Sequence, residues 1–522
     1  MSRAIGIDLG TTFTCVAFMK SASEVAVVTN NDGNKITPSV VTYESQLTIV
    51  GEDAVAKRGK NPKNTVFQVK RFMGREASDP EIKKRTYPFE IIASNKGNAS
   101  IRITPIGSKE SKVLCPEQIS SDIIRYVKTM AEKAMGHEVF EAVITVPANF
   151  TNAQRQATVD AGEIAGLKVL RIINEPTAAA LAYGFGKLVL VYDLGGGTFD
   201  VSIVEIKGTE AVVKSTQGLT FLGGEDFDYR LYEESVARFR TMVKRETFEE
   251  LCQDLFEKTI DCVKEAIRES KCKKEKIDDV VLVGGSSRIP RVNELLRELF
   301  GSTKLKFDIP PDHAVGHGAA ILAASLTQNR DSDITKFVGG TVRLADVTPF
   351  SLGMNIAFDR MLVFIPRNSS YPMSETKTLS NAGHMQTELK FQILEGEMAM
   401  ASKNNLLGSV IIEVMPKPMG KNDLEVRDSL IVKMVLNALN HSFPPLELIK
   451  HSIFKSMLTV AERNQMVKDS KKRAADEEIE REKFKARTAF ADALMRVKVS
   501  VRGAATEEKG RAMKQIIARE EE

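Results

Sequence analysis

Two glycine-rich turns of one design contain the residues best suited to bind phosphate. IGIDLGTTFTCV at 5–16 and VYDLGGGTFDVSIV at 191–204 each run from an apolar strand pattern through Asp-Leu-Gly into a turn and a second strand. Glycine turns let backbone N–H groups face a ligand without Cβ atoms in the way, so they can cradle phosphate oxygens. Asp8 and Asp193, just before the turns, offer the carboxylate oxygens that suit Mg²⁺, directly or through water. The same turns supply hydroxyl groups from Thr11, Thr12 and Thr198.

A third turn has the same character. VVLVGGSSRIPRV at 280–292 has the pattern of a strand, a Gly-Gly-Ser turn and a helix start, where free N–H groups and the helix dipole favour an anion. The pattern is neither the GxxxxGK[ST] of a P-loop nor the GxGxxG of a Rossmann site. One Asp-Leu-Gly turn alone is typical of an ordinary hairpin, but the three turns together predict a phosphate site. By pattern alone, Lys70 is an ordinary surface lysine and Glu175 an ordinary helix-start acid.

These turns need a scaffold of strands and helices to bring them together. Apolar strand-like runs alternate with helical patterns through residues 1–325, which predicts a large α/β domain. The repeated hairpin design implies two related halves that face a common ligand. We expect an α/β domain that carries the phosphate site at 1–328, an interdomain linker at 329–345, a β-rich domain at 346–456 and a helical segment with a tail at 457–522.

Composition argues against several classes of partner. The chain has 73 Lys and Arg against 69 Asp and Glu, and the net charge of +4 is spread along it, so neither nucleic acid nor a membrane is an expected partner. The five cysteines are widely spaced without a CxxC, which favours reduced thiols over disulfides or zinc ligands. We find no signal-peptide or transit-peptide pattern and no apolar run long enough to span a bilayer. The expected location is therefore cytoplasmic.

Taken in order, the motifs resemble those of the seventy-kilodalton heat-shock chaperone family. The matching stretches are IGIDLGTTFTCVAF, NTVFQVKRFMGR, AVITVPANFTNAQRQAT, RIINEPTAAALAYG, YDLGGGTFDVSIVEI, FLGGEDFD, VLVGGSSRIPRV, DVTPFSLG and NNLLG. The match is dense through about residue 325, recognisable to about Gly420 and weak beyond it. The resemblance implies an actin-like (ribonuclease H-like) α/β ATPase domain of two lobes, a β-sandwich-like peptide-binding domain and a short α-helical lid. The implied function is a molecular chaperone that binds apolar segments of unfolded polypeptides under control of ATP binding and hydrolysis.

The resemblance also assigns roles around ATP or ADP, with Mg²⁺ and K⁺ as the ions. Lys70 would approach the γ-phosphate, and Glu175 and Asp200 would help to position the metal and the attacking water. Asp8 and Asp193 would hold Mg²⁺ through water. The residues expected around the phosphates are Gly10, Thr11, Thr12, Gly195, Gly196, Gly197 and Thr198. The residues expected on the phosphate, ribose and adenine side are Gly223, Gly224, Gly284, Gly285, Ser286, Arg288 and Asp312, while Phe13 stands where the family usually has tyrosine.

Communication between the domains is a further implication of the resemblance. Four residues match family positions with known roles. Pro147 matches a proline switch and Arg155 matches an arginine relay. Arg171 and Asp346 match a charged pair that bridges the domains and responds to a J-domain co-chaperone. The linker departs from the family, because GGTVRLADVTP replaces a leucine run with only Val342 and Leu344 as apolar residues. We therefore expect loose linker docking and weak coupling.

The second domain departs from the family as well. Ala357 and Ala382 align with the arch over the peptide, and Leu389 aligns with a central pocket residue that is usually valine. A larger side chain there predicts a shallower pocket. Beyond Gly420 the family's hairpin signal is missing, so the back of the sandwich is expected to be rebuilt. The chain ends in AREEE rather than the family's Glu-Glu-Val-Asp, so tetratricopeptide co-chaperones are not expected partners.

The largest departure follows the FLGGEDFD turn. In the family, the chain climbs from this turn into an upper lobe before it returns through a segment like RETFEELCQDLFEKTIDCVKEAI, but here the two are separated by only about twenty residues. We predict that the upper lobe of the second half is deleted near 235–248. The lobe's grip on ribose and adenine would be lost, leaving Arg288 to stack on one face of the base. ADP should then leave quickly, and the family's nucleotide exchange factors are not expected partners.

Two other classes of function stay open. A catalytically slow or idle relative could act as a holdase or as a co-chaperone of a full-length chaperone, and single-turnover ATP hydrolysis separates it from the ATPase. A sugar-kinase-like enzyme of the same actin-like fold is the other alternative, and phosphorylation of a small molecule would support it.

Overall fold

The computed structural model describes most of the first two thirds of the chain and parts of the remainder. The described residues are 4–21, 23–44, 47–105, 108, 110–183, 186–208, 210–238, 243–327, 342–370, 373, 375–380, 385, 387–413, 423–427, 452–453, 458–476 and 479. Within these ranges no helix has both the length and the apolar character needed to cross a membrane.

The first lobe, residues 4–174, is built on a mixed six-stranded sheet. Its strands are β1 (Ala4–Leu9), β2 (Phe13–Met19), β3 (Val25–Val27), β4 (Thr37–Pro38), β11 (Glu141–Val146) and β12 (Lys168–Asn174). They lie in the order β12-β11-β1-β2-β3, with β4 beside β2. Helices α3 (Pro116–Met135) and α4 (Asn152–Ile164) pack together next to the sheet. Strands β1 and β11 are buried almost throughout, as expected for a sheet that is covered on both faces.

The second lobe, residues 186–306, repeats this plan. Its strands are β13 (Leu188–Leu194), β14 (Phe199–Lys207), β15 (Glu210–Leu219), β16 (Asp279–Val283) and β17 (Leu305–Lys306). Its longer helices are α8 (Gln253–Ser270), which packs on β14 and β15, and α9 (Pro290–Phe300), which packs on β17. The short helices η3 (Lys274–Lys276), η4 (Gly285–Arg288) and η5 (Ser302–Lys304) lie in its loops.

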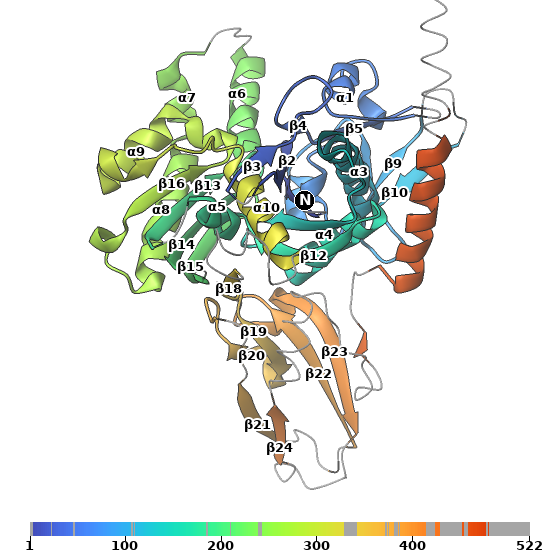
Figure 1. Cartoon of the computed structure of the whole chain (residues 1–522). Helices are drawn as coiled ribbons and strands as arrows, with labels where there is room; N and C mark the ends of the chain where they lie inside the picture. Colours follow the sequence, from blue (N-terminus) through green and yellow to red (C-terminus); the bar gives the residue numbers. More distant parts are fainter. Residues whose placement is uncertain are drawn as a thin grey trace, which may run out of the picture.

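Two central helices separate the sheets of the two lobes (Figure 1). Helix α5 (Glu175–Tyr183) packs on β13 and β14, and α10 (Ala314–Thr327) packs on β1, β2 and β11. They touch each other closely, because a Cβ atom on Gly318 would lie 1.7 Å from the carbonyl oxygen of Ala178. Buried alanines line both helices, which allows this approach.

The repeated hairpin predicted from the sequence is present in both lobes. Strands β1 and β2 are antiparallel with Asp8 opposite Cys15, and β13 and β14 are antiparallel with Asp193 opposite Asp200. Each Asp-Leu-Gly turn therefore lies at the same end of its sheet's hairpin. All five cysteines are free thiols.

The two lobes differ in the elements added to this plan. The first lobe has two small antiparallel sheets, made of β5 (Val40–Tyr43), β6 (Thr48–Val50) and β7 (Thr65–Phe67), and of β8 (Glu90–Ala93), β9 (Ala99–Ile103) and β10 (Lys112–Leu114). It also has α1 (Glu52–Lys57), α2 (Pro80–Lys83), η1 (Pro62–Asn64) and η2 (Val69–Arg71). The described part of the second lobe has α6 (Gly224–Arg238) and α7 (Arg245–Leu251) at the same end of the molecule (Figure 1).

The described end of the linker is docked, which makes the expectation of loose docking wrong. Strand β18 (Arg343–Ala345) extends the sheet of the second lobe by pairing in parallel with residues Glu210–Val212 of β15. Val342 is 3% exposed and joins the apolar core between the sheets. Backbone hydrogen bonds and one buried valine hold this strand, so a leucine run is not required for docking.

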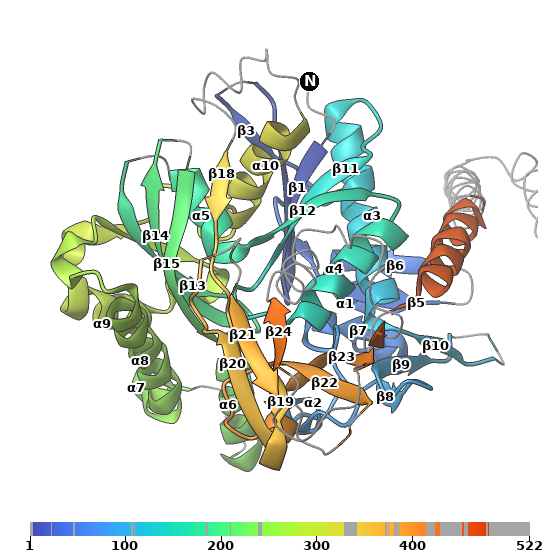
Figure 2. The same cartoon turned by 90° about the horizontal axis from the view of Figure 1, so that it is seen from below.

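The second domain is β-rich, as predicted. One sheet has the order β20-β19-β22-β23-β25, and two further strands pair separately. The strands are β19 (Leu352–Ile356), β20 (Arg360–Ile365), β21 (Thr376–Ser380), β22 (Glu388–Glu395), β23 (Asn405–Glu413), β24 (Asp423–Arg427) and β25 (Ser452–Ile453), with short helices η6 (Ala357–Asp359) and η7 (Ala401–Lys403). Figure 2 shows β20, β19, β22 and β23 in the foreground from below. Most of the segment beyond Gly420, where a rebuilt sandwich was expected, lies outside the described residues.

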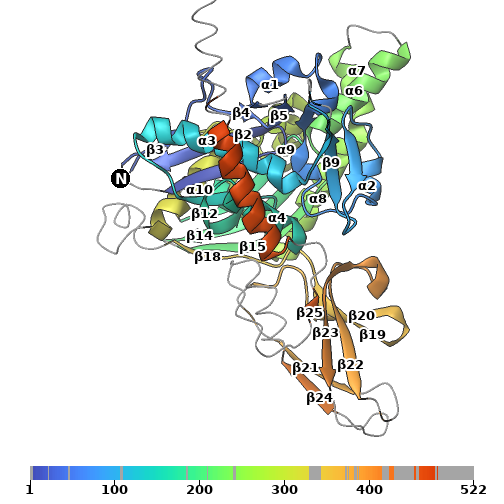
Figure 3. The same cartoon turned by 90° about the vertical axis from the view of Figure 1, so that its right-hand side faces the viewer.

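A helix at residues 460–476 lies along the first lobe, away from the β-rich domain (Figure 3). Arg463 Nη1 is 3.2 Å from Asp160 Oδ1 and 2.9 Å from Glu163 Oε2 in α4, and Lys96 Nζ is 2.7 Å from Glu462 Oε2. The predicted lid therefore contacts the first lobe where it is described. Most of the rest of segment 457–522 lies outside the described residues.

Candidate functional site

One cavity of about 450 Å³ lies between the lobes and is lined by all three predicted glycine turns. Of the residues proposed from the sequence, it brings together Asp8, Gly10, Thr11, Thr12, Phe13, Lys70, Glu175, Asp193, Gly195, Gly196, Thr198, Gly224, Gly284, Gly285, Ser286, Arg288 and Asp312. They come from both lobes, from the start of α5 and from the loop before α10. The pseudo-symmetric hairpins thus converge on one ligand-sized space.

Two predicted glycines, Gly197 and Gly223, support the turns from behind the cavity lining. A Cβ atom on Gly197 would lie 2.6 Å from the hydroxyl oxygen of Thr11, and one on Gly223 would lie 2.5 Å from the backbone of Gly196. Gly196 itself approaches Thr12, where a Cβ atom would lie 1.9 Å from the hydroxyl oxygen. The two Asp-Leu-Gly turns therefore press against each other, and glycine is the residue that allows this contact.

Lys70 and Glu175 form a buried ion pair at the cavity wall. Lys70 Nζ lies 2.6 Å from Glu175 Oε1, and both side chains are less than 10% exposed. Lys70 lies in η2 of the first lobe, while Glu175 begins α5 at the end of β12. A buried lysine with a single carboxylate partner is poised to share its charge with an anion that enters the cavity.

Three aspartates complete the charged end of the cavity, and two of them, Asp193 and Asp200, are buried. Burial and the charge of Glu175 raise the pKa of Asp8 to about 7, and the same two causes raise the pKa of Asp200 to about 7. Burial, followed by Glu175 and Asp200, also raises the pKa of Asp193. Asp200 is just behind the cavity lining, where Asn149 Nδ2 donates to its Oδ1 at 2.8 Å. So many buried acids beside one lysine leave an excess of negative charge that a cation would relieve.

The donor set fits Mg²⁺ held largely through water. The described residues contain no group of three or more Asp, Glu, His or Cys side chains close enough to hold a metal ion among them. Mg²⁺ commonly keeps several waters and uses one or two carboxylates together with substrate phosphates. Asp8 and Asp193, one from each turn, could supply those carboxylates.

The other end of the cavity is more open. Arg288 in η4 forms an ion pair with Asp312, yet the Arg288 side chain remains 56% exposed. The cavity as a whole is also lined by residues that were not proposed from the sequence, namely Cys15, Ile36, Glu225, Asp228, Val283, Pro311 and Val315. The apolar ones resemble ordinary core positions in sequence, and the acids resemble the charged start of a helix. Glu225 and Asp228 are three residues apart in the helix that begins at Gly224, so helical spacing places them on one face, and this is the signal by which the sequence could have identified them.

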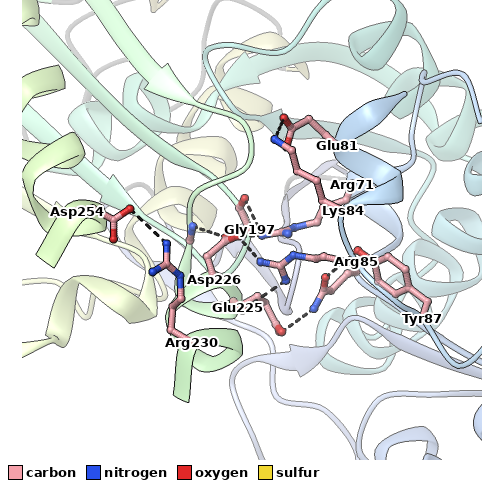
Figure 4. A network of polar contacts seen from close by, with 12 residues as sticks. Arg71, Glu81, Lys84, Arg85, Tyr87, Gly197, Glu225, Asp226, Arg230 and Asp254 are labelled. Atoms are coloured by element: carbon pink, nitrogen blue, oxygen red, sulfur yellow. Dashed lines mark hydrogen bonds and ion pairs between the residues drawn. The ribbon is translucent and has the colours of Figure 1, made fainter. Parts of the chain in front are cut away.

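A network of polar contacts joins the lobes beside the start of α6 (Figure 4). Asp226 accepts hydrogen bonds from Arg71 at 2.7 Å and from Arg85, both in the first lobe. Arg71 Nη2 also donates to the carbonyl oxygen of Gly197 at 3.2 Å, and Gln68 Nε2 donates to Glu225 Oε2 at 2.5 Å. The start of α6 is thus fixed to the first lobe and to the phosphate turn.

The predicted interdomain residues lie near the docked linker and α4. Asp346 is buried and accepts a hydrogen bond from Asn174 Nδ2 at 2.7 Å and one from Thr177 Oγ1 at 3.5 Å. Arg171 is not within ion-pair distance of Asp346, and it lowers the Asp346 pKa from farther away against the larger effect of burial. Arg155 donates to the carbonyl oxygens of Ala148 and Phe150, just after Pro147 in the β11–α4 loop.

The second domain touches the two-lobed domain near these residues. Glu395 in β22 accepts from the side chain of Asn152 at 3.1 Å, and Arg367 Nη2 donates to the carbonyl oxygen of Thr216 in β15 at 3.2 Å. Of the predicted peptide residues, Ala357 lies in η6. The backbone of Leu389 pairs with Ile412, but its side chain, like all of Ala382, lies outside the described residues.

Comparison with known proteins gives the same family over nearly the whole chain. The model of the family described as Hsp70 protein matches residues 4–244 and 237–522. A ribosome-associated molecular chaperone of Saccharomyces cerevisiae is 39% identical over 480 residues, covering 81% of this chain and 77% of the relative. Heat shock 70 kDa protein 2 of Paracoccidioides lutzii is 37% identical over 546 residues, covering 93% and 82%. The heat shock 70 kDa protein of Ajellomyces capsulatus is 36% identical over 568 residues, covering 98% and 79%.

The chain is shorter than these relatives. The alignment of 568 positions exceeds the 522 residues of this chain, so that relative has residues that this chain lacks. The two family matches meet at residues 237–244, between the end of α6 and the start of α7.

Proposed function

The chain belongs to the Hsp70 protein family. From this premise we propose that it is a molecular chaperone whose affinity for unfolded polypeptide is controlled by ATP. The observation that carries the proposal is the cavity where both Asp-Leu-Gly turns, Lys70 and Glu175 meet. A docked linker strand connects the lobe behind this cavity to the β-rich domain. A change in the separation of the lobes would therefore change the packing of this strand, because it pairs with β15 of the second lobe and Val342 lies in the core between the two sheets.

The proposed reaction is hydrolysis of ATP to ADP and phosphate. Lys70 faces the γ-phosphate and is oriented by Glu175, while the backbone N–H groups of the glycine turns bind the phosphate oxygens. Asp8 and Asp193 would hold Mg²⁺ through water, and the ion would neutralise phosphate charge. Glu175 and Asp200 would orient the attacking water, and Asp200, whose Oδ1 is held by the Asn149 side chain, would accept the proton that the water loses. Such a site acts mainly by position and charge.

Single-turnover ATP hydrolysis tests this proposal. Lys70→Ala should lower the rate about 100-fold or more, because it removes a buried positive charge next to the reacting phosphate. Lys20→Ala is the matched control, since Lys20 is an exposed lysine that pairs with Glu24 at the surface. An unchanged rate in Lys70→Ala would show that the assignment of the site is wrong.

The partners follow from the family and are part of the proposal. The β-rich domain would bind extended apolar peptide, and Arg171, Asn174 and Asp346 would respond to a J-domain co-chaperone. We place the protein in the cytoplasm because relatives of this similarity are named as ribosome-associated. A peptide titration with no affinity in the ATP or ADP state would remove the chaperone activity from the proposal.

We also propose that α6 and α7 are joined where relatives have an upper lobe. The meeting of the two family matches at 237–244 supports this proposal. Without that lobe, ADP should dissociate quickly, and the family's nucleotide exchange factors should lack most of the surface that they bind. Stopped-flow measurement of ADP release checks both points, because slow release that an exchange factor accelerates would contradict them.

A further inference from the structure

Helix α6 has two exposed aromatic side chains above the nucleotide cavity. Tyr232 is 63% exposed and Tyr229 is 38% exposed, and their ring centroids are 6.3 Å apart. The opposite face of the helix is packed, because Phe227 contacts Phe248 and Phe256. The exposed rings are therefore not the buried side of an amphipathic helix.

The exposed face is continuous with the wall of the cavity. Glu225 and Asp228 line the cavity from the first turn of α6. Residues four apart lie on one helical face, so Tyr229 follows Glu225 and Tyr232 follows Asp228, each about 6 Å farther along the axis. Tyr229 is turned toward the first lobe, since the Arg85 guanidinium lies 5.5 Å from its ring centroid. Tyr232 is not itself among the residues that line the cavity, and helical spacing places it one turn beyond Asp228, past the end of the lining that α6 contributes.

The facing wall is η4, which carries Arg288. Helix η4 lies next to the start of α6, because a Cβ atom on Gly224 would be 2.3 Å from the hydroxyl oxygen of Ser286. Both elements contribute to the lining of the cavity, which ends in the exposed Arg288 and its partner Asp312. A nucleotide with its phosphates at the glycine turns would project its base between η4 and α6.

We propose that Tyr232, with Tyr229 beside it, is the stacking surface for the base of the nucleotide bound in this cavity. The proposal rests on the proposed nucleotide site and names the part of the ligand that α6 recognises. Arg288 would cover the other face of the base, as a guanidinium does over a π system. A stacking surface accepts any base with a π face, so the substrate class is nucleoside triphosphates with weak preference among bases.

Affinity measurements separate the base from the phosphates. With Mg²⁺ present, Tyr232→Ala should weaken binding of ATP and ADP about 5- to 150-fold, the range of base–aromatic stacking, and leave inorganic tripolyphosphate unchanged. Tyr232→Phe should keep the wild-type affinity because it retains the ring. Phe140→Ala, at an aromatic side chain that is 49% exposed elsewhere in the first lobe, is the control and should have no effect.

The absence of tryptophan from the sequence allows a direct readout. Tyr232→Trp introduces a single indole, whose fluorescence should change on addition of ATP or GTP and not on addition of tripolyphosphate. If wild-type protein binds ATP but Tyr232→Ala binds it equally well, the stacking proposal is overturned and the nucleotide site stands. If wild-type protein binds neither ATP nor tripolyphosphate, the proposed nucleotide site itself is overturned, and the stacking surface with it.

Discussion

At the scale of single residues, the glycine turns of the cavity depend on glycines that touch backbone. Gly223 is one of them, because its hypothetical Cβ atom would lie 2.5 Å from the carbonyl carbon of Gly196 and from the amide nitrogen of Gly197 in the facing turn. No side-chain rotation can relieve that collision. The phosphate turn itself would have to move.

We therefore expect Gly223→Ala to weaken ATP binding about 5- to 150-fold, the equivalent of an overpacking cost of roughly 1–3 kcal/mol that falls on the turn. Isothermal titration with ATP and Mg²⁺ measures the loss. Gly59→Ala is the control, since a Cβ atom there would have nothing within 4 Å. Wild-type affinity in Gly223→Ala would mean that the turn does not bind phosphate in the conformation described.

The sequence located the charged end of the site better than the open end. Asp8 and Asp193 stand next to glycine turns, a local signal that needs no knowledge of the fold. Lys70 and Glu175 could be found only through the resemblance, because a lysine in an apolar segment and an acid at a helix start are common in surfaces. The proposed stacking residue Tyr232 has no local signal in the sequence, since only the position of α6 beside the cavity distinguishes it from any exposed tyrosine.

At the scale of elements, the docking of the linker strand β18 is a feature that local sequence patterns do not predict. Alternating apolar residues and glycine turns predict the paired hairpins, because those elements satisfy most of their hydrogen bonds locally. Strand β18 instead completes a partner far away in sequence, the free edge of β15. The linker's few apolar residues suggested weak docking, yet backbone pairing depends on that edge and not on side-chain composition.

We expect Val342→Asp to undock this strand, because an aspartate without a partner is costly in a site that is 3% exposed. ATP should then no longer accelerate peptide release, which fluorescence anisotropy of a labelled peptide would show. Arg343→Ala is the neighbouring control, since Arg343 is exposed. Normal ATP-stimulated release in Val342→Asp would separate the linker strand from the coupling.

At the scale of the whole molecule, docking of the second domain buries an acid. Burial raises the pKa of Glu395 from an ordinary value of 4.5 to about 7, although hydrogen bonding by Asn152 and the charge of Arg155 oppose the shift. The docked form thus retains a proton that the undocked form releases. Its contribution to docking is fully present below about pH 4.5 and is lost as the pH rises through about 7.

Docking should therefore weaken as the pH is raised from 5.5 to 7.5 (about two units) in the wild type, and Glu395→Gln should remove most of this dependence because glutamine stays neutral. Small-angle scattering measures the fraction of extended molecules across the range. Glu397→Gln is the control in the same domain, since the hydrogen bonds that its carboxylate accepts within the described residues come from Ser351 of that domain. Equal pH profiles for wild type and Glu395→Gln would exclude Glu395 as the group that titrates.

The position of α10 between the sheets has a consequence for how the chain is made. Strand β1 is among the first segments to leave the ribosome, but the helix that covers it, Ala314–Thr327, follows some three hundred residues later. At a translation rate of about 5–20 residues per second, strand β1 would wait roughly 15–60 s before α10 is made. A nascent chain in that state exposes apolar surface of the kind that chaperones recognise, so during its own synthesis this protein should itself be a client.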